Sequence, residues 1–102
     1  MVIEWLKFQV KPESREKFIQ QDAQIWTPFL EQYSGFLSKE VWINPKKEDE
    51  VIFIIRWENW EKWKAVPHTL VEATEQQFAA AMGENEYKLI EGSGYQVRKF
   101  PN

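Results

Sequence analysis

The feature that most constrains the fold of this chain is an unbroken apolar run from Val51 to Ile55, inside the segment 51–58 (VIFIIRWE). A strand with one face in water alternates apolar and polar residues, whereas an unbroken run indicates burial on both faces. The run is far shorter than a membrane span. We therefore expect segment 51–58 to be a central strand of a sheet.

Three other segments have the composition and spacing of strands. They cover residues 2–10, 36–43 and 87–100. The last of them contains Gly92-Ser93-Gly94, where a bend or bulge is expected. The charged segment 44–50, between the second and third strands, is predicted to be a solvated turn.

Proline and glycine mark the bounds of a first helix. Pro12 suits an initial helical position, and Ser34-Gly35 suits a helix end. Between them, apolar side chains recur at helical spacing, with Asp22 as the polar member of that face. Pro28 must kink this helix or end it near Thr27, since its ring removes a donor and clashes with the preceding turn.

Two more helices are expected after segment 51–58. Asn59 is a candidate N-cap for a short one through Trp60, Trp63 and Ala65. A longer one is predicted over residues 68–82, between the breakers Pro67 and Gly83.

The resulting order is β-α-β-β-α-α-β. With the last two helices counted as one connection, this is the split βαβ, or ferredoxin-like, order of an α+β domain. We expect a single domain over residues 1–102, with a four-stranded antiparallel sheet and helices on one of its faces.

Both faces of the predicted strands carry apolar residues. In the third strand, one face carries Val51, Phe53, Ile55 and Trp57, and the other carries Ile52 and Ile54. In the second strand, one face carries Phe36 and Trp42, and the other carries Leu37, Val41 and Ile43. In the first strand, one face carries Ile3 and Trp5, and the other carries Val2, Leu6 and Phe8. The helices cover one set, and the other would expose roughly several hundred Å², a level unusual for monomers. A homodimer formed by sheet-to-sheet packing of a second copy is expected to cover it.

Charge and composition exclude several classes of function. The net charge is −3 and the basic residues are scattered, which argues against binding nucleic acid or an anionic membrane surface. The chain has no cysteine, so thiol nucleophiles and thiolate metal sites are excluded. The N-terminus lacks the apolar run of a signal peptide, and a cytoplasmic location is expected. No P-loop, nucleophile elbow or dinucleotide glycine pattern occurs.

The candidate functional residues are few. His68 is the single histidine, which makes it either a general base or a capping or surface residue. With one histidine and scattered carboxylates, no metal site is expected. The other candidate pocket residues are Trp60, Trp63, Arg56, Tyr33 and Asp22.

Each of these has two interpretations. Trp60 and Trp63 either stack on a flat ligand or pack a short helix onto the sheet. Arg56 either binds an acidic substrate group or pairs with a neighbouring glutamate. Asp22 and Tyr33 lie on the apolar face of the first helix and look into the same cavity or lie at its rim. Glu4, which interrupts an apolar strand face, raises the same question.

Four segments resemble a known superfamily. They are Gly35-Phe36-Leu37, Trp57-Glu58-Asn59-Trp60-Glu61-Lys62-Trp63, Trp26-Thr27-Pro28-Phe29-Leu30 and Trp63-Lys64-Ala65-Val66-Pro67. Together with the length and the element order, they resemble the dimeric α+β barrel superfamily, and within it an uncharacterised small family of antibiotic biosynthesis monooxygenase-like proteins. The resemblance implies a sheet-to-sheet dimer with one pocket per subunit between helices and sheet. Members include cofactor-free oxygenases of aromatic polyketides and haem-degrading enzymes.

The haem-degrading branch uses an Asn on the first strand, a Trp after the third strand and a His on the following helix. Trp63 matches that Trp, but residues 2–10 contain no Asn, and His68 precedes the expected position near Val71 or Glu72. Haem or tetrapyrrole handling is therefore the least favoured function. Two others stay open: an oxygenase-like activity, without a cofactor, on a small hydrophobic or aromatic molecule, or a non-catalytic module of the same fold for ligand binding, interaction or stress.

Overall fold

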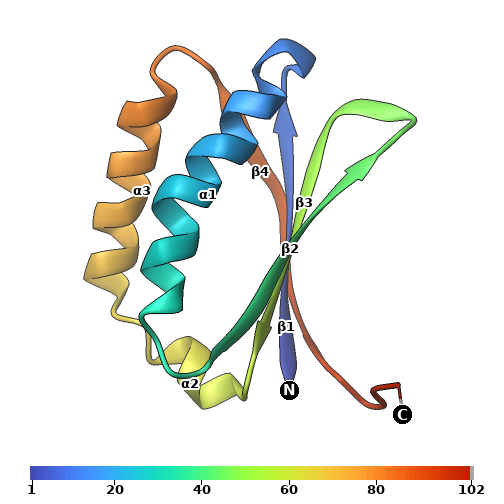
Figure 1. Cartoon of the computed structure of the whole chain (residues 1–102), viewed down its shortest axis with the longest axis vertical. Helices are drawn as coiled ribbons and strands as arrows, with labels where there is room; N and C mark the ends of the chain where they lie inside the picture. The colour runs from blue at the N-terminus through green and yellow to red at the C-terminus, as the bar shows by residue number, and fades with distance from the viewer. Residues whose placement is uncertain (102) are drawn as a thin grey trace.

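The computed structural model describes residues 1–101. Its four strands form one antiparallel sheet in the order β2-β3-β1-β4, and the long helices α1 and α3 lie against one face of that sheet (Figure 1). The elements are β1 (Val2–Val10), η1 (Pro12–Ser14), α1 (Arg15–Glu31), β2 (Phe36–Asn44), β3 (Lys47–Trp57), α2 (Trp60–Lys64), α3 (His68–Met82) and β4 (Tyr87–Gln96). The ferredoxin-like order and the central place of β3 are confirmed. No helix among the described residues is long and apolar enough to cross a membrane.

Of the two outcomes expected from Pro28, a kink or an end near Thr27, the end does not occur, because the first helix continues to Glu31. Its last turn buries Leu30, and the Phe29 ring meets those of Trp26 and Tyr33 edge-on at 5.9 and 5.4 Å. These contacts offset the cost of an interior proline, which is about 3 kcal/mol.

The charged segment 44–50 is mostly strand, so the prediction of a long turn was wrong. A tight turn joins Asn44 to Lys47, and the Asn44 side-chain oxygen accepts the N–H of Lys46 at 2.9 Å. Lys7 on β1 lies 3.1 Å from Glu50. This cross-strand ion pair lets a charged segment continue the sheet.

Two bulges set which side chains face the helices. In β2 the register shifts between Phe36 and Ser38, so Phe36 faces the helices and meets Trp57, while Trp42 lies on the open face opposite Ile52. The prediction that Phe36 and Trp42 share a face was therefore wrong. Lys39 faces the helices opposite Ile55, on the same face as Val41 and Ile43 by regular alternation, and the bulge brings Phe36 onto that face as well.

The second bulge lies in β4, but not at the glycines. The register with β1 shifts between Glu91 and Leu89, which leaves Ile90 as the extra residue. Gly92 and Gly94 instead sit in the regular ladder, opposite Leu6 and Glu4. The strand ends at Gln96 rather than at residue 100.

The core lies between the helices and the sheet, in two clusters. One consists of Val10, Phe18, Val51, Phe53, Phe78 and Met82, and the other of Val2, Leu30, Ile55 and Trp57. Within residues 1–101, no helix covers the opposite, open face of the sheet (Figure 1). By register, its apolar members are Ile3, Trp5, Trp42, Ile52, Ile54 and Tyr95.

Candidate functional site

A cavity of about 390 Å³ opens between the helices and the inner face of the sheet. It is lined by residues of both core clusters and by α2 and α3. Five of the lining side chains are aromatic: Phe8, Trp26, Phe53, Trp57 and Trp63. This size and lining are typical of sites for small molecules.

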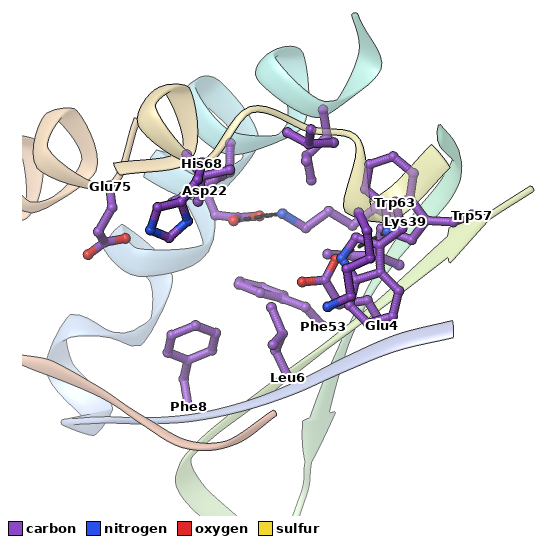
Figure 2. Close-up of a pocket in the computed structure, with 16 residues that line it drawn as sticks. Glu4, Leu6, Phe8, Asp22, Lys39, Phe53, Trp57, Trp63, His68 and Glu75 are labelled. Carbon is purple, nitrogen blue, oxygen red and sulfur yellow. Dashed lines mark hydrogen bonds and ion pairs between the residues drawn. The ribbon is translucent and has the colours of Figure 1, made fainter. Parts of the chain in front are cut away.

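A buried ion pair forms part of the cavity wall. The Lys39 ammonium on β2 lies 2.7 and 2.6 Å from the two carboxylate oxygens of Asp22 on α1, and the two side chains are only 5% and 3% exposed. The ammonium also lies 4.4 Å from the centre of the Phe53 ring. Asp22 thus has a partner for each oxygen, and the pair is held in one place (Figure 2).

Glu4 supplies a second carboxylate. It lies on β1 between Val2 and Leu6, on the face that alternation directs towards the helices. The indole N–H of Trp57 donates to its Oε1 at 3.1 Å. Oε2 accepts no hydrogen bond from the described residues, and the carboxylate points into the space beneath the Asp22–Lys39 pair (Figure 2).

Burial controls the protonation of this region. Desolvation raises the pKa of Glu4, against the opposing effects of the Trp57 hydrogen bond and the positive charges of Lys64 and Lys39. Desolvation likewise raises the pKa of Asp22 and lowers that of Lys39, while their mutual attraction opposes both changes. Each carboxylate is therefore a stronger proton acceptor than one in water.

The mouth of the cavity carries groups that are more exposed. His68 Nε2 lies 2.9 Å from Glu72 Oε1, and the His68 side chain is 84% exposed. Glu75 accepts the hydroxyl of Tyr87 at 2.5 Å, and burial with this hydrogen bond raises the pKa of Tyr87. Lys64 lies over the rings of Trp60 and Trp63.

The structure brings three of the six predicted site residues to the cavity. His68, Trp63 and Asp22 line it. The side chain of Trp60 is half-exposed and meets the Trp63 ring edge-on at 4.8 Å, so it lies behind the wall and does not form it. The two remaining predicted residues, Arg56 and Tyr33, do not line the cavity.

Their positions have a simple cause. Arg56 alternates with Ile55 and Trp57, which face the helices, so it emerges on the open face and pairs with Glu40. Tyr33 packs beside Phe29 against the second core cluster. Lys39 is the polar lining residue that the sequence analysis did not single out; it stands opposite Ile55, on the face of β2 that turns to the helices. Within residues 1–101 no cluster of three His, Asp or Glu side chains is placed to hold a metal ion.

Solved structures share this architecture. SnoaB from Streptomyces nogalater, described as a cofactor-independent oxygenase, is 17% identical over 97% of this chain and 94% of its own, with a TM-score of 0.68. A candidate antibiotic biosynthesis monooxygenase from Chloroflexus aurantiacus is 22% identical over 98% and 96%, with a TM-score of 0.66. One from Deinococcus radiodurans is 15% identical over 100% and 97%, with a TM-score of 0.69. At these identities the likeness establishes the fold.

The family is established by the sequence itself. No curated protein matches this chain. The model of the antibiotic biosynthesis monooxygenase family, however, matches residues 1–69, which include β1, α1, β2, β3 and α2. The chain therefore belongs to the antibiotic biosynthesis monooxygenase family.

Proposed function

We propose that this protein oxidises a small hydrophobic or aromatic molecule with O₂, without a tightly bound cofactor. The observation that carries the proposal is the cavity between helices and sheet, with its aromatic lining and a polar wall made of Glu4, Asp22 and Lys39. Trp26, Phe8 and Trp63 offer flat surfaces on which rings stack. The family membership and the cofactor-independent oxygenase among the similar structures support the same class of reaction.

The chemistry needs a substrate that is easily deprotonated. A base removes a proton from a carbon next to a carbonyl or phenol system, and the electron pair left on the substrate reduces O₂. For a methylene compound the net reaction is R₂CH₂ + O₂ → R₂C=O + H₂O, in which carbon loses four electrons and the two oxygen atoms gain them. The protein's contribution is to orient the rings, accept the proton and stabilise the anion.

A non-catalytic ligand-binding module is the second candidate. The observation in its favour is that Asp22 and Lys39 neutralise each other. These two charged groups therefore need no substrate group to balance them. Such a protein would bind flat molecules and consume no oxygen.

We also propose that the working form is a homodimer. Trp42 and Tyr95 on the open face are 47% and 55% exposed, and Ile3, Trp5 and Ile52 lie beside them. A second copy packed sheet to sheet would cover this surface. The cavity lies between the helices and the inner face of the sheet, away from the open face, so each subunit would carry its own site.

Oxygen uptake tests the proposed activity. The purified protein would be mixed with a panel of anthrones, naphthols and cyclic diketones, in the presence of a chelator, and O₂ would be followed with an electrode. We expect saturable uptake with at least one flat compound, with product formed in equal amount. Saturable binding with no uptake across the panel would favour the second candidate.

A further inference from the structure

We propose that Glu4 is the general base of this reaction, and that its Oε2 takes the proton from the acidic carbon or hydroxyl of the substrate. This inference rests on the proposed function, and it assigns the base to the inner end of the cavity rather than to His68 at the mouth. It also defines the substrate class as a flat molecule whose acidic proton reaches β1 when its rings lie between the aromatic side chains.

The geometry of Glu4 suits this task. Trp57 is fully buried, and its indole N–H holds Oε1 at 3.1 Å, which fixes the orientation of the carboxylate. Oε2 is left facing the cavity without a partner among the described residues (Figure 2). A base with one oxygen fixed and the other free presents its acceptor in a defined direction, which general-base catalysis requires.

Of the other proton acceptors of the lining, Asp22 is engaged through both oxygens, whereas Glu75 and His68 lie at the mouth of the cavity, away from its inner end. Both oxygens of Asp22 contact the Lys39 ammonium at 2.7 and 2.6 Å. Glu75 accepts the hydroxyl of Tyr87. His68 pairs with Glu72 and is 84% exposed, so water competes for its nitrogens. Among the described lining residues, Glu4 combines a free acceptor atom with a desolvated position.

The positive charges around Glu4 act on both sides of the transfer, because they lower the proton affinity of the Glu4 carboxylate and stabilise the substrate anion. Lys39 from β2 and Lys64 from α2 act on Glu4 electrostatically, and Asp22 from α1 and His68 and Glu75 from α3 line the same cavity. When the proton moves to Oε2, Glu4 becomes neutral and the negative charge passes to the substrate. The Lys39 and Lys64 ammonium groups then face an enolate or phenolate, which they stabilise.

The test separates proton abstraction from oxidation. Anthrone has an acidic methylene and is the probe. Its exchange of that hydrogen for deuterium would be followed by NMR in D₂O without oxygen, and O₂ uptake would be measured separately. We expect the wild-type protein to catalyse exchange, and Glu4→Gln, in which Trp57 still has an oxygen to bond, to lose about 100-fold or more. Glu84→Gln, on the exposed turn after α3, is the matched control and keeps the wild-type rate.

Each result decides between the claims. Wild-type exchange that Glu4→Gln abolishes, with no O₂ uptake by any form, would support Glu4 as base and reject the oxygenase. O₂ uptake that survives in Glu4→Gln but is lost in His68→Gln would reject Glu4 and keep the oxygenase. Absence of wild-type exchange would overturn the inference.

Circular dichroism checks that Glu4→Gln is folded. If it is unfolded, Glu4→Asp replaces it as the test. This variant pulls the acceptor back by one methylene and is expected to lower the exchange rate.

Discussion

At the scale of single residues, the Asp22–Lys39 pair carries a desolvation cost that its short contacts do not show. Burial raises the pKa of Asp22 and lowers that of Lys39, so both charged forms are disfavoured by desolvation and persist because each neutralises the other. Removal of one partner leaves a charge in the wall of the cavity. Removal of both leaves a neutral wall.

The first prediction follows from this asymmetry. We expect Asp22→Asn to lower the free energy of unfolding by about 3–5 kcal/mol, and the double variant Asp22→Asn with Lys39→Met to recover most of that loss. Urea unfolding at neutral pH measures all members of the cycle. Losses that simply add in the double variant would show that the two groups do not depend on each other.

Glu4 gives a prediction about pH. Its folded pKa is raised above the ordinary value of 4.5, so the native state binds a proton more readily than the unfolded chain. Its contribution to stability is therefore greatest below pH 4.5 and is lost as pH rises through the raised pKa. We expect Glu4→Gln to be more stable than the wild type at neutral pH, with that advantage disappearing in acid. Thermal unfolding at several pH values measures this, and an advantage independent of pH would contradict it.

Two of the three polar residues in the wall were accessible from the sequence. Asp22 falls among apolar residues on a helical face, and Glu4 interrupts an alternating strand. Lys39 was not, because alternation places it with Val41 and Ile43 but does not show which face of β2 meets the helices, and Phe36 joins that face only through the extra residue in β2. A bulge leaves no pattern of its own in a single sequence when, as here, it contains no glycine.

At the scale of elements, the short helix α2 is positioned by the strand beneath it. A Cβ atom on Gly94 would lie 2.9 Å from Trp60 Cζ3 and 3.1 Å from Trp63 Cζ3, closer than ordinary contact. The glycine in β4 is therefore what allows α2 to pack against the sheet and Trp63 to line the cavity.

Gly94→Ala tests this packing. We expect it to displace α2, to cost about 1–3 kcal/mol of stability and to weaken binding of a flat ligand such as anthrone. Gly92→Ala is the matched control, since its nearest neighbour, Leu6 Cδ2, would lie at 3.4 Å, an ordinary contact. Thermal unfolding and a binding titration distinguish the two variants, and equal effects would show that Gly94 has no special role in holding α2.

The same scale shows where local signals are insufficient. The Asn59 cap was evident, and its side chain accepts the N–H of Lys62 at 2.8 Å. The end of α1 and the start of β3 were not, because tertiary contacts decided both. Leu30 packs in the core beyond Pro28, and Glu50 pairs with Lys7 across the sheet. Such contacts are not visible in the residues next to a boundary.

At the scale of the whole molecule, the fold followed from one apolar run and the order of the elements, because a sheet with helices on one face has few arrangements for them. Function did not follow in the same way. The cavity depends on how α2 and α3 close over β1, and the identity of the polar groups facing it depends on strand register. The resemblance implied a pocket between helices and sheet, and the sequence offered Asp22 and His68 as candidates for it but not Lys39.

The open face of the sheet gives the last prediction. Trp5 lies in this face between Ile54 of β3 and Ser93 of β4, so a charge there would be buried in a sheet-to-sheet dimer and solvated in a monomer. We expect light scattering at micromolar concentration to show a dimer for the wild type and a monomer for Trp5→Lys. Leu70→Lys, at a 48% exposed position on α3, is the control and should remain dimeric. Because the cavity lies on the helix side of the sheet, away from Trp5, a monomeric Trp5→Lys should still bind a flat ligand, which separates assembly from site formation. A wild-type protein that scatters as a monomer would mean that the open face is tolerated in water, and would remove the dimer from the proposed function without affecting the cavity.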